Sequence, residues 1–120
     1  MEETNVGWRL YIMYFVVILF VLLSSTAFGQ VKIAYFNAEW NKSNGVVWIH
    51  DLSDVNTISY VDIASQKKLA TKHKIAVIPT IIIFKDDEEV ARFQADLSFK
   101  MVATRREIQE EIDNQLMSDF

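Results

Sequence analysis

The chain has 120 residues, of which 51% are apolar and 23% are charged, and its formal net charge is −4. This length is typical of one small domain, the apolar content excludes a disordered chain, and no lysine- or arginine-rich stripe provides a footprint for nucleic acid. Because there is no cysteine and there are only 2 histidines, the sequence excludes disulfides, thiolate nucleophiles and cysteine- or histidine-rich metal sites, and we expect neither a metal nor a cofactor.

The chain begins with a strongly apolar segment. Residues 10–23 form an unbroken apolar run, and no charged side chain occurs between Arg9 and Lys32. A run of this length suits the hydrophobic part of a signal peptide, and small residues such as Ala27 and Gly29 are typical of the positions before a cleavage point. Without cleavage, the uncharged stretch is long enough to anchor the chain in a membrane.

Two alternatives therefore stay open for the first segment. Residues 1–29 are either a signal peptide, which makes the protein exported (periplasmic or secreted), or a hydrophobic helix that anchors the protein. In the second case the contact with the membrane lies within residues 10–31. In both cases residues 30–120 form one domain, large enough to bury about 60–65% of its unfolded surface.

The domain sequence predicts four strands. Segments rich in β-branched and aromatic residues give Val31–Phe36, Thr57–Asp62, Thr80–Phe84 and Glu89–Phe93. The third of these is apolar on both faces, which is typical of a central strand. An acidic turn at residues 85–88 joins it to the fourth as a hairpin.

Three helices are expected around these strands. Gly45–Leu52 predicts a short helix, and Ser65–His73 predicts a second one with Ser65 as its N-cap. For the last helix, Thr104 and Glu107 have the spacing of a capping box, and isoleucine or leucine recurs every fourth residue behind them. The order is β-α-β-α-β-β-α, which favours an α/β domain whose helices cover a small sheet.

This order, together with three local strings, resembles the thioredoxin family. The strings are YFNAEW at residues 35–40, YVDIA at residues 60–64 with the helix after it, and VIPT at residues 77–80 with the strand after it. The resemblance covers residues 31–117 and implies a thioredoxin-like mixed four-stranded sheet with flanking helices, preceded here by the N-terminal hydrophobic helix. It also implies a cis peptide bond at Ile78–Pro79, beside the loop that follows Trp40.

The family's disulfide chemistry is missing from this chain. That chemistry needs a Cys-x-x-Cys loop, and the matching string is Asn41-Lys42-Ser43-Asn44. The resemblance places Tyr35 where the family has a buried acid, and Tyr60 at about the position of the lysine that accompanies it. Thiol–disulfide exchange is therefore not expected, and we expect that the protein is not an enzyme.

Other features have simpler interpretations. Nothing places a histidine against Ser43, and the acidic turn lacks the ligand spacing of a calcium loop. Asn41-Lys42-Ser43 is a glycosylation sequon, which matters only on a eukaryotic secretory route. Trp48 and Tyr60 are expected to pack in the core, whereas the resemblance implies that Trp40 is exposed beside the loop.

The main hypothesis is a redox-inactive, thioredoxin-like module that binds a protein or peptide partner without covalent chemistry. By the resemblance, an extended segment of that partner would lie in a groove by strand addition, and the groove consists of Trp40, Asn41, Asn44, Ile78, Pro79 and Thr80. Two alternatives stay open. The fold is a scaffold in a membrane-associated assembly, or the chain is a divergent copy of a thiol–disulfide oxidoreductase without its own turnover.

Overall fold

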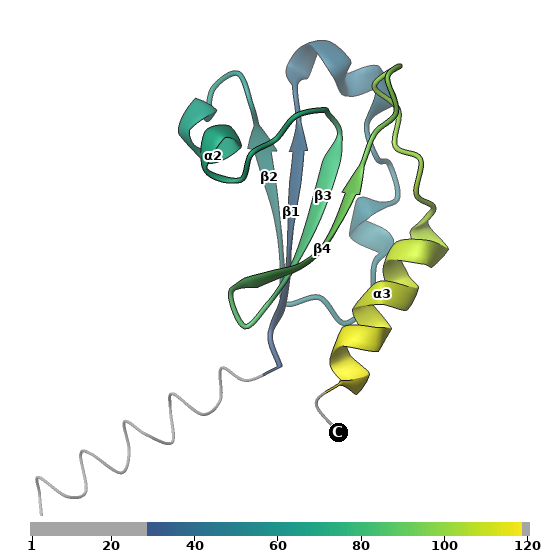
Figure 1. The fold of residues 1–120 in the computed structure, drawn as a ribbon. Coiled ribbons are helices and arrows are strands. Elements are labelled where there is room, and N and C mark those ends of the chain that lie inside the picture. Colours follow the sequence, from purple (N-terminus) through teal and green to yellow (C-terminus); the bar gives the residue numbers. More distant parts are fainter. Residues whose placement is uncertain (1–28, 119–120) are drawn as a thin grey trace, which may run out of the picture.

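The structure is a computed structural model that describes residues 29–118 (Figure 1). The predicted signal peptide or anchoring helix therefore lies outside the described residues, except for Gly29. Within the described range, no helix has the length and apolar character needed to cross a membrane.

One mixed sheet of four strands organises the domain, in the order β2-β1-β3-β4. Strand β1 (Val31–Asn37) runs parallel to β2 (Thr57–Asp62) and antiparallel to β3 (Thr80–Lys85). Strand β4 (Glu88–Gln94) returns antiparallel to β3. The predicted α/β fold class and the four predicted strands are confirmed.

The hairpin between β3 and β4 turns over two aspartates. Asp86 and Asp87 have φ angles of 51° and 68°. A two-residue turn with both φ angles positive matches the right-handed twist of the strands it joins, and aspartate tolerates this conformation better than most residues. The acidic string that predicts a turn therefore forms one for a local reason.

The sheet carries an apolar core on each face. Ile81 and Ile83 point into the larger core, where the helix α3 (Arg105–Met117) contributes Ile108 and Ile112. Between them, Ile82 points into a smaller core on the opposite face, formed with Phe36 and Val61. The short helix α2 (Lys67–Lys72) packs there through Leu69, so α2 and α3 cover opposite faces of the sheet (Figure 1).

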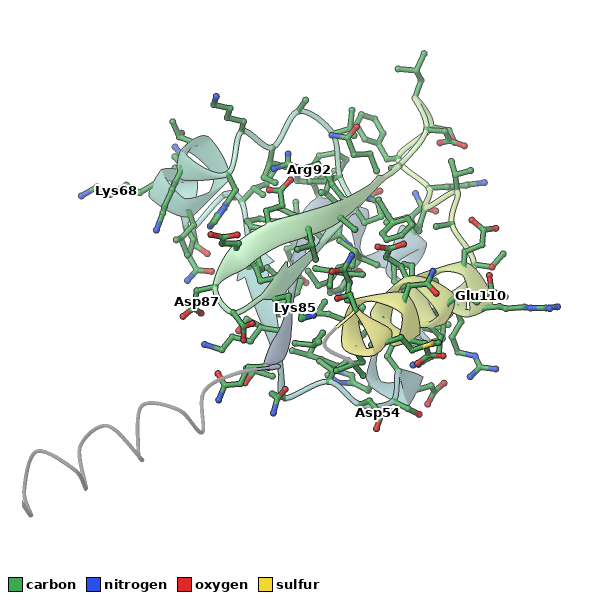
Figure 2. All side chains as sticks on the ribbon, turned by 60° about the horizontal axis from the view of Figure 1, so that its bottom comes forward. Asp54, Lys68, Lys85, Asp87, Arg92 and Glu110 are labelled. Atoms are coloured by element: carbon green, nitrogen blue, oxygen red, sulfur yellow. The ribbon has the colours of Figure 1, made fainter. Side chains whose placement is uncertain are left out.

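The start of α3 follows the sequence prediction. The side chain of Thr104 accepts a hydrogen bond from the backbone N–H of Glu107 at 3.2 Å, which confirms Thr104 as the N-cap. Charged side chains such as Asp54, Lys68, Asp87 and Glu110 project from the periphery of the domain (Figure 2).

The helix predicted at 45–52 is wrong. The 3₁₀ turn η2 (Ile49–Asp51) lies in this segment instead, and another 3₁₀ turn, η1 (Glu39–Asn44), precedes it. The buried side chains of this segment are Val46, Ile49 and Leu52, which are spaced by three residues. Ile49 lies in η2 while Val46 and Leu52 flank it, so the buried side chains recur every three residues and do not follow the 3.6-residue repeat of an α-helix.

The N-cap predicted at Ser65 is also wrong. Helix α2 begins at Lys67, and the residue before it, Gln66, makes no side-chain capping bond. Asp62 takes over this region, because its carboxylate accepts a bond from the N–H of Ala64 at 2.8 Å and its carbonyl accepts one from Gln66 at 2.8 Å. The turn formed by Asp62 delays the start of the helix.

Candidate functional site

A chain of amide side chains fills the loop after β1. Asn41 is only 3% exposed, and its Nδ2 donates to Asn37 Oδ1 and to the carbonyl of Phe99, both at 3.1 Å. Asn44 Nδ2 donates in turn to Asn41 Oδ1 at 2.9 Å. The two asparagines at the family's cysteine positions therefore bond to each other, and Asn41 has both its donor hydrogens and its carbonyl oxygen engaged within the domain.

The network continues into the sheet through Tyr35. Its hydroxyl accepts bonds from Asn37 Nδ2 at 3.2 Å and from the N–H of Val46 at 2.8 Å. Tyr35 thus links the loop after β1 to the segment that follows η1. The Tyr35 hydroxyl therefore has a structural role as the acceptor of both bonds.

Tyr60 lies beside Tyr35 on the neighbouring strand. The two residues are register partners, and their ring centroids are 5.5 Å apart. Tyr60 is 52% exposed, so the prediction that it packs in the core is wrong, whereas Trp48 is partly buried against the larger core as predicted. Partial burial, followed by the nearby Asp62 carboxylate, raises the pKa of Tyr60 above its usual value.

An apolar pocket opens beside this network. Trp40 is 64% exposed, and its ring meets that of Phe99 edge to face, with centroids 5.3 Å apart. The pocket that both rings line has a volume of about 140 Å³, and its lining consists of Trp40, Ile63, Ile75, Ala76, Val77, Ile78 and Phe99. We call this the Trp40–Phe99 pocket.

Phe99 is held over the pocket by a tight loop. One carboxylate oxygen of Asp96 accepts bonds from Ser98 N at 2.9 Å, Ser98 Oγ at 2.6 Å and Lys100 N at 3.2 Å. These bonds, led by that from the serine side chain, lower the pKa of Asp96. No motif in the sequence marks Phe99, because the connection from residue 95 to residue 104 contains several other apolar residues, such as Leu97 and Met101.

The six predicted groove residues divide into two sets. The side chain of Trp40 is exposed and that of Asn44 is half-buried. The other four are buried, namely Asn41, Ile78, Pro79 and Thr80. The Ile78–Pro79 peptide bond is cis. The structure thus brings Trp40 and Ile78 together at one pocket and leaves Asn41 inside the fold.

Burial also bears on the sequon at Asn41. Because Nδ2 of Asn41 donates to two acceptors inside the domain, a glycan on this nitrogen would remove at least one of those bonds and occupy space that the Phe99 loop fills. Glycosylation of Asn41 is therefore incompatible with this fold.

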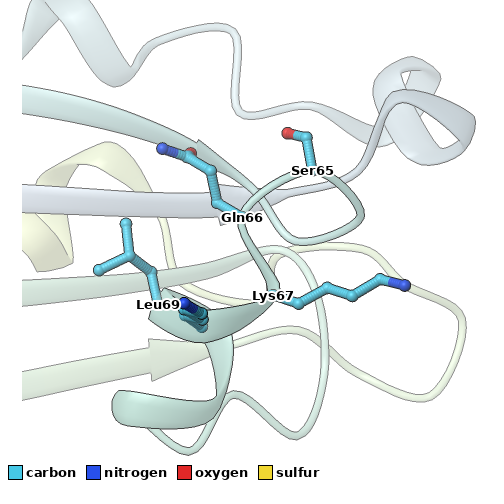
Figure 3. Close-up of a pocket in the computed structure, with 5 residues that line it drawn as sticks. Ser65, Gln66, Lys67 and Leu69 are labelled. Atoms are coloured by element: carbon cyan, nitrogen blue, oxygen red, sulfur yellow. The ribbon is translucent and has the colours of Figure 1, made fainter.

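The cavity beside α2 lacks a catalytic constellation. A cavity of about 440 Å³ lies at the start of α2, and its lining consists of Ser65, Gln66, Lys67, Lys68 and Leu69 (Figure 3). Neither a histidine nor a carboxylate lines it. Within residues 29–118, no group of three or more metal-ligating side chains comes together.

A second cavity, of about 340 Å³, lies where the smaller core ends. His73 lines it together with Lys32, Lys72 and Asp87. The imidazole packs edge-on between Phe36 and Phe84, at centroid distances of 5.7 Å and 5.5 Å. This placement explains a lowered pKa for His73, because burial and then the charge of Lys72 disfavour its protonated form.

We expect this histidine to make the domain less stable in mild acid. The folded-state pKa of His73 lies below its unfolded value of about 6.5, so unfolded chains take up the proton first as the pH falls through that value. Urea unfolding at pH 7.5 and pH 5.5 measures the effect as a drop in the midpoint. His73→Phe keeps the aromatic contacts and should shrink the drop, whereas an equal drop in both proteins would contradict the assignment.

Arg92 on β4 lies next to His73 and contributes to the charge around it. Its guanidinium donates to the carbonyls of His73 at 2.7 Å and Lys74 at 3.2 Å, and it pairs with Glu89 at 2.7 Å. Glu89 favours a protonated His73 and Arg92 opposes it, so the two partly cancel. Arg92 therefore ties β4 to the end of α2 as a structural group.

Comparisons with known proteins agree with this architecture. No protein-family model and no curated protein sequence matches the chain. Among solved structures, a point mutant of the thioredoxin of Halobacterium salinarum NRC-1 is similar at a TM-score of 0.58 and 17% identity, over 73% of this chain and 76% of that one. The thioredoxin of Fasciola hepatica has a TM-score of 0.56 and 20% identity, over 80% and 90%.

Thioredoxin 1 of Thermosipho africanus is similar at a TM-score of 0.56 and 19% identity, over 73% of this chain and 97% of that one. These likenesses show that the described domain has the thioredoxin fold. Because the chain contains no cysteine, it lacks the dithiol on which disulfide exchange on this fold depends.

Proposed function

We propose that the domain is a redox-inactive thioredoxin-like module that holds an extended segment of a protein partner at the Trp40–Phe99 pocket. The observation that carries the proposal is a large aromatic side chain, 64% exposed, at the mouth of an apolar pocket. Exposed tryptophans beside desolvated pockets are typical binding hot spots. The partner would place an apolar side chain in the pocket and keep its own backbone extended.

The amide network supports this role by holding the pocket open in one shape. Asn41 fixes the carbonyl of Phe99, so the loop that carries one wall of the pocket is bonded to the loop that carries the other wall. A pocket that is already formed saves the partner the entropic cost of ordering it. Since the side chains at the two cysteine positions are amides, the encounter is non-covalent and reversible.

Replacing Trp40 by alanine tests the proposal. Peptides selected from a random display library on the full chain serve as probes, and their dissociation constants are measured by calorimetry. Trp40→Ala is expected to weaken binding about thirtyfold or more, because the loss of a buried indole contact costs about 2 kcal/mol or more.

Met117→Ala is the matched control, since Met117 is as exposed as Trp40 but lies on α3. If the selected peptides bind the two variants equally well, the partner surface lies elsewhere and the scaffold alternative is favoured. Insulin reduction by the purified protein would contradict the redox-inactive assignment directly.

We propose further that the module works outside the cytoplasm or at a membrane, because of the apolar run at residues 10–23. Intact mass and membrane fractionation of the chain, expressed from its first residue, distinguish the two forms. A mass that begins at Gln30 in a soluble exported fraction indicates a signal peptide. A full-length mass in the membrane fraction indicates an anchor, and a full-length soluble cytoplasmic product would contradict both.

A further inference from the structure

Strand β2 lies at the outer edge of the sheet, and no strand of residues 29–118 pairs with its free side. The N–H of Ile63, just after β2, donates to the carbonyl of Asn37 on β1 at 3.0 Å. Because backbone direction alternates along a strand, the polar groups of Ile58, Tyr60 and Asp62 face away from β1. The carbonyl of Asp62 is taken by the N–H of Gln66, which leaves Ile58 and Tyr60 available to a further strand.

The two edges of the sheet differ in how they discourage pairing. Strand β4 begins with Glu88 and Glu89, and its ladder with β3 is broken between Ile83 and Phe84. Charges and bulges are the usual devices that protect an edge. Strand β2 has a regular register with β1, and no residue from Thr57 to Val61 is charged. Most of these residues favour β structure, so β2 lacks the devices that protect β4.

We propose that β2 pairs in antiparallel fashion with β2 of a second copy of this chain. The two-fold axis passes beside Ser59, so that the sheet continues from one copy into the other. Ile58 of each copy then lies opposite Tyr60 of the other copy, and these two pairs exchange backbone hydrogen bonds. Such an isologous contact closes on itself and gives a dimer and not a filament.

The sequence of β2 is complementary to itself in this register. Tyr60, which is 52% exposed, would be covered by Ile58 of the second copy, a favourable pair of an aromatic and a β-branched side chain. Thr57 lies opposite Val61. Asn56 and Asp62 come at the ends of the paired segment and add no backbone bond, because the N–H of Asn56 donates to the carbonyl of Val31 and the carbonyl of Asp62 accepts from Gln66. No two like charges lie opposite each other, although each chain has a net charge of −4.

Registers shifted by one residue in either direction create less favourable pairs between the two copies. An axis at Tyr60 would place Ile58 opposite Asp62, whose carbonyl already accepts a bond from Gln66. An axis at Ile58 would bring Asp62 opposite Asp54 of the other copy, which sets two carboxylates side by side. Self-pairing about Ser59 is therefore the register that the edge fits, and this match favours a second copy over an unrelated strand.

A single cysteine tests the contact, because the chain has none of its own. Two Ser59 residues at the axis form a non-hydrogen-bonded pair, with Cα atoms about 4.5 Å apart, which lies within the range of a disulfide. The full chain with Ser59→Cys, kept in mild detergent and oxidised gently, is expected to give a disulfide-linked dimer on a non-reducing gel. Ser43→Cys and Met117→Cys are matched controls, since both residues are exposed and lie off β2.

A second change separates edge pairing from chance encounters. Tyr60→Lys in the Ser59→Cys chain places a charge on the free edge and should reduce the dimer to the level of the controls. If Ser59→Cys gives no more dimer than the controls, or if Tyr60→Lys leaves the dimer unchanged, the proposal is overturned. The peptide-binding pocket is not involved, so the Trp40→Ala experiment succeeds or fails independently.

Discussion

Replacing Asn41 by alanine is expected to lower the free energy of unfolding by about 3 kcal/mol. The change leaves Asn37 Oδ1, the carbonyl of Phe99 and Asn44 Nδ2 without the partners they have in the domain. Each buried group that loses its hydrogen bond costs about 1–3 kcal/mol, and Asn37 is as deeply buried as Asn41. Urea unfolding measured by far-UV circular dichroism gives the difference.

Asn44→Ala is the control for this prediction. Asn44 is half-buried and its amide makes one bond within the network, so its loss should cost about 1 kcal/mol or less. Asn41→Ala should also weaken peptide binding, because the Phe99 loop loses its bond to the loop that carries Trp40. Equal destabilisation by the two alanine variants would show that Asn41 does not hold the network together.

The strands could be predicted because their signal is local. The run from Thr80 to Phe84 is apolar on both faces, and a strand buried on both faces needs that pattern wherever it lies. The cap of α3 is equally local, since Thr104 and Glu107 are three residues apart and bond to each other. Such features depend on neighbours in the sequence and not on the rest of the fold.

The role of Asn41 could not be predicted, because its partner is distant. The sequence shows asparagine where a reactive cysteine would stand, which is enough to exclude thiol chemistry. Whether the amide faces outward or inward depends on the carbonyl of Phe99, 58 residues later. Asn41 is therefore buried and does not line the Trp40–Phe99 pocket, at which partner binding is proposed.

The exposure of Tyr60 also depends on the rest of the fold and could not be predicted from its neighbours in the sequence. Its strand is rich in β-branched and aromatic residues, and such a pattern predicts a strand but not its place in the sheet. Because β2 is an edge strand, one side of Tyr60 meets Tyr35 and the other is open. The same position that makes the burial prediction wrong creates the free edge on which dimerisation is proposed.

Truncating side chains at the centre of β3 should lower the free energy of unfolding by different amounts on the two faces of the sheet. Ile81 and Ile82 are neighbours, are both fully buried and lose the same atoms on mutation to alanine. Ile81→Ala is expected to cost about 4 kcal/mol and Ile82→Ala about 2–3 kcal/mol, within the range for such changes. Urea unfolding of both variants, with equal m-values as a check of two-state behaviour, measures the costs.

The difference follows from what covers each face. Ile81 packs in the larger core under α3, a helix of 13 residues with a bonded N-cap and two fully buried isoleucines, so the space left by the mutation cannot close. Ile82 faces a core whose other buried members are Phe36 and Val61, under a helix of 6 residues with none buried. A short helix can move inward and fill part of the space, which lowers the cavity cost.

Val90→Ala is the control on β4, since Val90 is exposed and its truncation should change stability by about 0.5 kcal/mol or less. A larger cost at Ile82 than at Ile81 would mean that α2 is held rigidly, for example by the bonds from Arg92 to the carbonyls of His73 and Lys74. Arg92→Ala would then allow α2 to move inward and would reduce the loss of stability caused by Ile82→Ala. The pair of isoleucines thus measures how firmly each helix is fixed to the sheet.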